Sequence, residues 1–445
     1  MCIDGGVLRA DTRPIVRTRQ GFLTRRDLMA QARELSLRLA SGPAAVNLCD
    51  SREHFLAALL ALEMRGQTCL MPPSRAAAVV AEVIAEHAGS FEITDALVAA
   101  ATSQRQPAMP QDLAFPAQRT IAIAYTSGST GRPKPNAKTW GAFAATTRHN
   151  AACIRAALPT VPSSSVPWIV ATVPSQHMYG MEFAVMLPLL EGTGIHAAHP
   201  LFPADIAATL AQVPEPRILV STPVHLKALL ESQMDLPPLA AVLSATAPLS
   251  AAVAAEIERR YATSVVEFFG STETCVIASR RTAHEIAWRP HSGVVLREVE
   301  GGTSVDAPWF GTPLQMQDVF DIDADGRFIV VGRSADMVEV AGKRASLADL
   351  TRRLLAVPGV RDAVVFQPDS SGDAVKVRRL AAFVVAPGLT EQVVAEGLAR
   401  ACDPVFVPRP LIVVPSLPRN EVGKLPREQL LTLLREHSRP SREPL

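Results

Sequence analysis

Residues 125–134 read YTSGSTGRPK, and this stretch decides the expected fold. The apolar run IAIAY at residues 121–125 leads directly into it, as a buried strand leads into a ligand-binding loop in an α/β protein. Gly128 and Gly131 allow a close approach of the backbone, and Lys134 adds positive charge. Backbone N–H groups in such a loop converge on an anion, so the stretch predicts a polyphosphate site. Four hydroxyl groups add donors: those of Thr126, Ser127, Ser129 and Thr130.

The glycine loop has two other interpretations. An ordinary flexible Gly/Ser linker is disfavoured, because a buried strand leads directly into the loop. A plain P-loop nucleoside triphosphatase is disfavoured because the pattern GxxxxGK[ST] does not fit. Lys134 lies between Pro133 and Pro135 instead.

Composition narrows the classes of function. The chain has 445 residues, 48% of them hydrophobic and 20% charged, so it can bury a sizeable core. Its 44 basic and 43 acidic side chains nearly cancel, which argues against nucleic-acid binding as the main activity. We expect a cytoplasmic protein with reduced thiols and no membrane span. The N-terminus lacks an apolar signal segment, no apolar run reaches membrane-helix length, and the six cysteines lack CxxC spacing.

Apolar runs alternate with helical patterns along the chain, which predicts an α/β fold with mixed sheets and helices. Helices are expected at residues 54–66 and within 21–40, where Thr24 is the expected N-cap. A hairpin is expected to turn at Asp325–Gly326, and beyond it the pattern becomes that of a small α+β unit. We expect a large domain over residues 1–333 and a small one over 334–445. Strands are expected at 44–50, 167–180, 218–223, 239–250 and 264–274.

Further motifs follow the glycine loop in order. FFGSTET occupies residues 268–274, VVGRSADMVEVAGKR lies at 330–344, and LPRNEVGKLPR lies at 417–427. Together with YTSGSTGRPK they resemble the signatures of the acyl-adenylate-forming superfamily of AMP-dependent synthetases and ligases. The resemblance implies a large N-terminal domain that binds ATP and a carboxylic acid, and a small mobile C-terminal domain.

The resemblance also implies a nucleotide site. Glu273 is the expected Mg²⁺ ligand, with the Thr126 hydroxyl, because Mg²⁺ prefers oxygen ligands; the alternative is a solvated glutamate in a surface turn. Phe269, with Gly270 and Thr272, is expected near adenine. Asp318 is expected at the ribose hydroxyls and Arg333 at ribose or phosphate. The residues that usually precede the ribose-binding aspartate in the family are absent before Asp318, so Asp321 and Asp323 remain alternatives.

Two expectations concern the mobile domain. Lys424 takes the position of the family's catalytic lysine, which would bridge the substrate carboxylate and the α-phosphate; the alternative is a solvated surface lysine. Ala335 takes the usual position of the hinge aspartate, and Asp336 follows it, so Ala335 or a neighbour would absorb the rotation.

The acid site is expected on two loops. VPSQHMYG at 173–180 resembles the family's acyl-site loop, where His177 would gate carboxylate and thiol access and Tyr179 and Gly180 would line the site; a core or loop histidine is the alternative. SATAPL at 244–249 would contribute Ala245 and Ala247, and Ala184 is a further small residue. HAAH at 196–199 is rejected as a metal pair because no third ligand is nearby.

The implied activity is adenylation of an acid by ATP, followed by thioester formation. The loop PSQHMYGME resembles stand-alone ligases of aryl-polyene and xanthomonadin pigment pathways, which implies an aryl acid such as 3- or 4-hydroxybenzoate. A fatty acid is the alternative substrate. No carrier domain is expected after the lysine motif, so the acceptor would be CoA or a separate acyl carrier protein. An inactive nucleotide-binding regulatory protein is the alternative of another class, although Glu273 and Lys424 argue against it.

Overall fold

The chain forms two units, which are described separately. The first contains residues 1–294 and 307–312, and the second contains 295–306 and 313–445. The expected boundary between residues 333 and 334 falls inside the second unit, and as the start of a mobile domain it stays a prediction. The structure is a computed structural model that describes residues 7–103, 112–127, 133–158, 162, 165–300, 302–333, 337–340, 343–368, 380–420 and 425–438.

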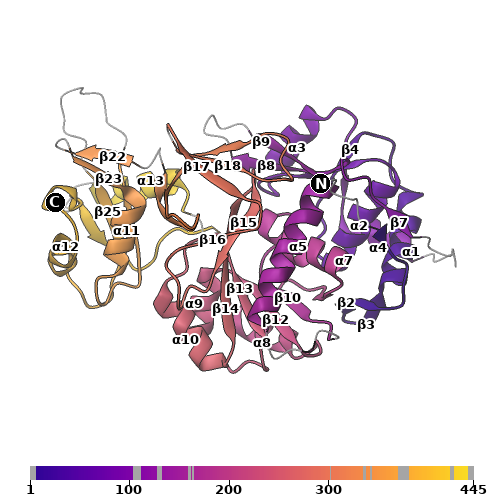
Figure 1. Ribbon diagram of the computed structural model, residues 1–445, viewed down its shortest axis with the longest axis horizontal. Helices are drawn as coiled ribbons and strands as arrows, with labels where there is room; N and C mark the ends of the chain where they lie inside the picture. The colour runs from indigo at the N-terminus through magenta and orange to yellow at the C-terminus, as the bar shows by residue number, and fades with distance from the viewer. Residues whose placement is uncertain are drawn as a thin grey trace, which may run out of the picture. The chain divides into compact units, whose positions relative to one another are not determined.

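A nine-stranded sheet organises the first unit (Figure 1). Its strands from β14 through β13, β12, β10 and β11 to β2 are parallel, and antiparallel strands close both edges. The loops that follow the parallel strands therefore emerge at one edge. In spatial order the strands are β16 (Arg289–Pro290), β15 (Cys275–Arg280), β14 (Ser264–Ser271), β13 (Ala241–Ser244), β12 (Arg217–Ser221), β10 (Trp168–Ala171), β11 (Gly194–His196), β2 (Pro14–Thr18) and β3 (Gly21–Thr24).

A five-stranded sheet carries the glycine loop. It is parallel except for its last strand, β9, which returns antiparallel to β8. The strands in order are β6 (Phe91–Ile93), β4 (Ala44–Asn47), β5 (Thr68–Met71), β8 (Thr120–Ser127) and β9 (Pro133–Thr139). A separate two-stranded ribbon pairs β1 (Val7–Leu8) with β7 (Leu113–Ala114).

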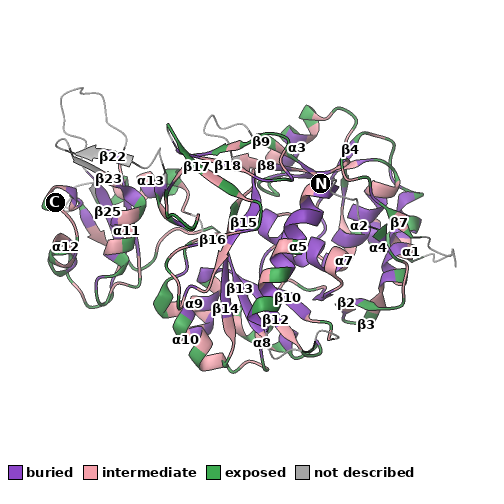
Figure 2. Ribbon diagram, in the orientation of Figure 1, coloured by how far each residue is buried: buried purple, intermediate pink, exposed green. Residues whose placement is uncertain are grey.

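The main core contains side chains from both sheets and from the helices that contact them. In β10, Ile169 and Ala171 join this core, whereas Trp168 and Val170 join a second cluster with helices α8 to α10. This alternation is what a strand covered on both faces requires. Figure 2 colours most of α2 and α5 as buried. The helices of the first unit are α1 (Arg25–Ser36), α2 (Arg52–Met64), α3 (Ala77–Glu86), α4 (Asp95–Thr102), α5 (Trp140–Ala157), α6 (Met178–Gly180), the π-helix η1 (Met181–Met186), α7 (Leu187–Glu191), α8 (Pro203–Leu210), α9 (Pro223–Ser232) and α10 (Ala251–Tyr261).

Local sequence explains where the first helix begins. The Thr24 side chain accepts a hydrogen bond from Asp27 N, and the Asp27 carboxylate accepts one from Thr24 N, which forms a capping box. The expected N-cap is confirmed. The helix occupies only part of residues 21–40, because Gly21–Thr24 pair with β2 as strand β3.

The second unit consists of small antiparallel sheets followed by an α+β end, of which the sequence predicted one hairpin and the α+β end. The predicted hairpin is confirmed: β20 and β21 pair, and Gly326 takes a positive φ of 76° in their turn. None of the described helices is long and apolar enough to cross a membrane. The elements are β17 (Val295–Val299), β18 (Gly302–Asp306), β19 (Leu314–Met316), β20 (Asp318–Ile322), β21 (Phe328–Arg333), β22 (Met337–Val340), β23 (Lys343–Ser346), α11 (Leu347–Leu355), β24 (Asp362–Phe366), β25 (Ala381–Val385), α12 (Glu391–Ala399), η3 (Pro404–Phe406), β26 (Leu411–Val413) and α13 (Arg427–Ser438).

Candidate active site

The β8–β9 hairpin holds the glycine loop at its tip. Thr126 in β8 lies opposite Lys134 in β9, and Ser127 lies opposite Pro133. Tyr125 faces the other side of the sheet, where its hydroxyl contacts His87 Nε2 at 2.5 Å. Alternation along the strand therefore places Thr126 and Lys134 on the face toward the main core, with Lys134 exposed at the tip. The expected loop residues Gly128, Ser129, Thr130 and Gly131 lie outside the described residues.

A buried lysine joins this hairpin to the FFGSTET turn. Lys138 Nζ donates a hydrogen bond to the backbone oxygen of Glu273 at 2.5 Å, and the Lys138 side chain is only 5% exposed. Lys138 lies on the same face of β9 as Lys134. The structure thus brings Thr126 and Lys134 onto the face of the hairpin that meets Glu273. Lys138 was not predicted from the sequence, where its one signal was a charge inside a strand that leads into an apolar helix.

The FFGSTET turn is internally fixed. Ser271 N donates to Thr274 Oγ1 at 3.0 Å, and Thr274 Oγ1 donates to Cys275 O at 2.7 Å. A Cβ at Gly270 would lie 2.1 Å from Cys275 O, so this close approach requires glycine. Thr272 and Glu273 are half-buried. This arrangement leaves the Glu273 carboxylate partly accessible while its backbone is held.

The predicted adenine neighbour, Phe269, lies beside two stacked groups. Its ring centroid is 5.2 Å from that of Trp288, and the Arg280 guanidinium lies 4.2 Å from the Trp288 centroid. Phe269 is half-buried at the end of β14. Its position at the carboxyl end of a parallel strand suits a flat ring ligand, and the adenine contact stays a prediction.

A buried glutamate supports the same turn from η1. Glu182 Oε1 accepts a hydrogen bond from Val276 N at 3.0 Å, and Asn150 Nδ2 donates to Glu182 Oε2 at 3.2 Å. Burial raises the pKa of Glu182 to about 7, although Asn150, Val276 and the Lys138 charge act in the opposite direction. A single acid in the apolar run MEFAVMLPLL was the available signal for this residue.

The raised pKa of Glu182 predicts a pH-dependent stability. Its folded pKa, about 7, lies above the ordinary value of 4.5, so protonation favours the folded state. The contribution is fully present below about pH 4.5 and is lost as the pH rises through about 7. Between about pH 5 and pH 8 we expect the free energy of unfolding to fall more in the wild type than in Glu182→Gln, as measured by urea denaturation. The matched control is Glu256→Gln on α10, which removes a half-exposed carboxylate paired with Arg259 and should follow the wild type. Equal pH slopes in all three proteins would contradict the assignment.

The expected acid-site loop is tightly folded. His177 caps α6, with Nδ1 accepting from Tyr179 N at 3.4 Å, and its side chain is half-buried. A Cβ at Gly180 would lie 2.0 Å from Pro174 O, so the loop requires glycine there. Tyr179 is 5% exposed and packs against Phe183 in the main core. Its burial favours a packing role, and contact with an acid stays a prediction for both His177 and Tyr179.

The SATAPL segment follows β13 with a strained turn. Thr246 has a positive φ of 81°, a conformation that costs energy for a residue with a side chain. Glu267 on β14 fixes the segment, because its Oε1 accepts from Leu249 N at 2.8 Å while Arg280 binds its other oxygen. Ala245 is buried and Ala247 is half-buried, whereas Ala184 is fully buried in the main core and lies away from any open surface.

Arg52 holds two of the loops at the carboxyl edge of the sheet. It is 1% exposed and donates to Ala171 O at 2.7 Å, to Val173 O at 2.8 Å, and to Ala198 O. Desolvation lowers the pKa of this guanidinium to about 9. Among the described residues, Arg52 binds only carbonyl oxygens, and these hydrogen bonds connect the ends of strands β10 and β11. No feature of the sequence indicates this role.

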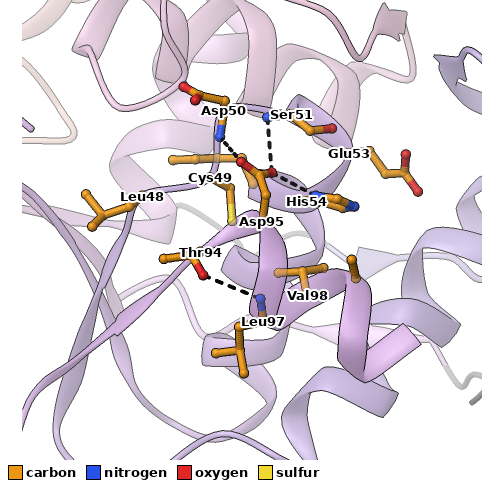
Figure 3. Close-up of polar contacts among 12 residues, drawn as sticks. Leu48, Cys49, Asp50, Ser51, Glu53, His54, Thr94, Asp95, Leu97 and Val98 are labelled. Atoms are coloured by element: carbon orange, nitrogen blue, oxygen red, sulfur yellow. Dashed lines mark hydrogen bonds and ion pairs between the residues drawn. The ribbon is translucent and has the colours of Figure 1, made fainter. Parts of the chain in front are cut away.

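A polar groove of about 670 Å³ lies beside the start of α2. Figure 3 shows that the Asp95 carboxylate points to this helix start, where it accepts from Asp50 N at 2.8 Å and Ser51 N at 3.3 Å. Asp95 also contacts His54 Nδ1 at 2.7 Å. These contacts satisfy the free N–H groups before α2, since Ser51 makes no side-chain cap. Asp95 therefore has a clear structural role in this groove.

The two histidines of the HAAH segment, residues 196–199, have different contacts. His196 Nε2 contacts Gln212 Oε1 at 3.3 Å, and His199 Nε2 contacts Thr172 O at 2.9 Å. The two imidazoles therefore serve different partners. Within the described part of the chain, no group of three or more His, Cys, Asp or Glu side chains is arranged to hold a metal ion.

In the second unit, two predicted ribose contacts are neighbours. Asp318 and Arg333 are register partners in the β20–β21 ladder. Asp323 instead binds its own turn, where Oδ1 accepts from Asp325 N and Arg327 N, both at 2.9 Å. Asp321 is exposed. Because the Asp323 carboxylate already accepts hydrogen bonds within its own turn, Asp318 is favoured over Asp323 as the ribose ligand. The ribose contacts of Asp318 and Arg333 stay predictions.

Lys424 lies outside the described residues, and so do Ala335 and Asp336. The chain on both sides of Lys424 is anchored within the second unit. Arg419 forms a two-pronged ion pair with Asp362, at 2.8 and 2.7 Å, and Arg427 Nη2 donates to Gln367 O at 2.9 Å. The catalytic role of Lys424 stays a prediction.

Comparison with known families decides the class. A family model described as "AMP-binding enzyme" matches residues 68–301, which include the glycine loop and the FFGSTET turn. The chain belongs to the AMP-binding enzyme family. This confirms the predicted acyl-adenylate-forming superfamily, and the chain is an enzyme of the acid–thiol ligase class.

Relatives and solved structures agree with the family. The chain is 27% identical to a 4-coumarate–CoA ligase of Halorhodospira halophila over 331 residues, which span 71% of this chain and 78% of that protein. It is 30% identical to a 4-coumarate–CoA ligase of Rhodobacter capsulatus over 279 residues, 61% and 65% of the two chains. The fold matches ATP-bound MatB from Rhodopseudomonas palustris with a TM-score of 0.77 at 19% identity, covering 96% of this chain and 97% of that one. The expected α/β fold is therefore confirmed.

Proposed function

We propose that this enzyme is an ATP-dependent carboxylic acid ligase that forms an acyl- or aryl-adenylate and then a thioester. One observation supports this most directly. The Lys138–Glu273 contact joins the glycine-loop hairpin to the FFGSTET turn, so the two expected phosphate and metal elements meet in one place. A regulatory protein that only senses a nucleotide does not need a partly accessible carboxylate, such as that of Glu273, on a backbone fixed in this way.

The described residues fit a magnesium–ATP ligand. Glu273 offers a partly accessible carboxylate, and Thr126 lies on the hairpin face that meets the Glu273 turn. Oxygen ligands from one or two side chains, with the phosphates supplying others, suit Mg²⁺. When bound, Mg²⁺ would neutralise charge on the phosphates. Lys134, exposed at the hairpin tip, would add a positive charge beside the loop that binds them.

In the first step, a carboxylate oxygen of the acid attacks the α-phosphorus of ATP. The bond from that phosphorus to the β-phosphate oxygen breaks, and pyrophosphate leaves. Such chemistry depends mainly on positioning and charge neutralisation. The backbone of the glycine loop, Thr126 and Lys134 would position the phosphates. Lys424 would bridge the attacking carboxylate and the α-phosphate.

In the second step, a thiol sulfur attacks the carbonyl carbon of the adenylate, and AMP leaves. A rotation of the residues after 334 would remove Lys424 and open access for the thiol. Because His177 Nδ1 accepts from Tyr179 N, a neutral His177 carries its proton on Nε2. That group would contact either the acid or the arriving thiol. The thiol would be CoA or the phosphopantetheine of a separate acyl carrier protein in the cytoplasm.

The acid is proposed to be aryl and hydroxybenzoate-like. Two relatives are named as ligases of 4-coumarate, an aryl acid, which favours an aromatic over a fatty substrate. The QHMYGME loop, with its resemblance to pigment-pathway ligases, supports the same choice. The small residues Ala245, Ala247 and Gly180 would form a flat wall of the pocket that binds the acid.

An ATP–pyrophosphate exchange screen tests this function. Benzoates, cinnamates and fatty acids are supplied singly, and exchange is expected only with a carboxylic acid, strongest for hydroxybenzoates. Mass spectrometry then compares CoA with a phosphopantetheinylated carrier protein as acceptor. Exchange with fatty acids alone would overturn the aryl assignment. Phosphate release without an acid would overturn the ligase assignment.

A further inference from the structure

We propose that Lys138 is a positioning residue for Glu273, and that it sets the geometry of magnesium–ATP binding while Glu182 holds the other end of the same turn. The inference rests on the proposed function, because it takes Glu273 and Thr126 as the magnesium ligands. Neither Lys138 nor Glu182 is expected to touch the nucleotide. Both would act through the backbone of the turn that carries Glu273.

Lys138 is buried, so its charge must be stabilised by groups inside the protein. An ammonium that is 5% exposed loses most of its hydration, which is costly unless hydrogen bonds and opposite charge replace the water. Here Nζ donates to Glu273 O at 2.5 Å.

Glu182 clamps the other end of the same short segment. Its carboxylate accepts from Val276 N, three residues after Glu273. Between these two clamps Cys275 adopts a positive φ of 58°, which is an unfavourable conformation for a residue with a side chain. The Lys138 ammonium and the Glu182 carboxyl group thus hold residues 273–276 in a shape that the backbone alone would resist.

Lys138 also links the two predicted metal ligands to each other. It belongs to β9, which pairs with the strand that carries Thr126, while its Nζ holds the residue that carries the other ligand. The separation of the Thr126 hydroxyl and the Glu273 carboxylate therefore depends on this contact. Mg²⁺ requires near-ideal octahedral geometry. A small displacement of Glu273 should therefore weaken the binding of magnesium–ATP more than the binding of ATP without the metal.

Calorimetry with α,β-methylene ATP tests the proposal on the full chain. With Mg²⁺ present, we expect Lys138→Met to bind this analogue about 10- to 100-fold more weakly than the wild type. Without Mg²⁺, the affinities of the two proteins should be nearly equal. Lys138→Arg should recover part of the loss, since it keeps a donor and a charge. Lys227→Met on α9 is the matched control and should bind as the wild type does.

A double variant separates positioning from charge balance. Lys138→Met alone leaves Glu182 without a nearby positive charge and should lower stability, whereas Lys138→Met with Glu182→Gln removes both ionisable groups. We expect the double variant to recover thermal stability but not magnesium-dependent affinity. Full recovery of that affinity would make Lys138 a counter-ion only and overturn the proposal, as would failure of both variants to fold. Wild-type protein that binds no magnesium–nucleotide would overturn the proposed function instead.

Discussion

Replacing Lys424 by alanine is expected to reduce acid-dependent ATP–pyrophosphate exchange by about 10²- to 10³-fold, the typical effect of removing one charge-stabilising donor. Lys424 would neutralise the charge that develops as the carboxylate attacks the α-phosphate. Thioester formation from supplied acyl-AMP should be nearly unchanged, because that step no longer needs this contact. The two half-reactions are measured separately, by isotope exchange and by thioester release.

The flanking anchors make this variant informative. Arg419 binds Asp362 and Arg427 binds Gln367 O, so the segment around Lys424 should keep its attachment after the side chain is shortened. Lys227→Ala on α9 is the control for removal of a lysine elsewhere, and it should leave both half-reactions unchanged. Equal loss of both half-reactions in Lys424→Ala would remove Lys424 from its assigned role.

The fold was predictable because the features that determine it are local. Strands covered on both faces appear as continuous apolar runs, such as the run within the predicted segment 218–223, whose first four residues lie in β12. Thr24 and Asp27 form a capping box that the sequence alone suggests, and Gly326 marks the β20–β21 turn. Each signal lies within a few residues of the element it specifies.

The support of the site was not predictable, because it depends on contacts between distant residues. Lys138 and Glu273 are 135 positions apart, and a lysine in a strand is ordinarily solvated. Arg52 similarly binds carbonyl oxygens more than a hundred positions away. Tyr179 was predicted to line the acid site, yet its ring packs edge-on against Phe183 in the main core. Motifs thus identified the groups at the site, and only the tertiary structure identified the groups that hold them.

Glu273→Gln is the second variant with a large expected effect. The substitution keeps the size and one oxygen of the side chain but removes its charge, so Mg²⁺ would lose its charged protein ligand. We expect exchange at a fixed Mg²⁺ concentration to fall by about 10²-fold, and the Mg²⁺ requirement to move to higher concentration. A magnesium titration of the exchange rate measures both effects.

The structure suggests why this substitution should leave the turn intact. The contacts that hold it use the backbone of Glu273 and Val276 and the hydroxyls of Ser271 and Thr274, none of which changes. Glu256→Gln, which removes a half-exposed carboxylate of α10 that pairs with Arg259, should show wild-type magnesium dependence. If Glu273→Gln lost activity without any shift in its magnesium requirement, the carboxylate would act on something other than the metal. Because Lys138→Met should shift the same requirement while Glu273 is still present, agreement between the two titrations would show that the ligand and its support act on one ion.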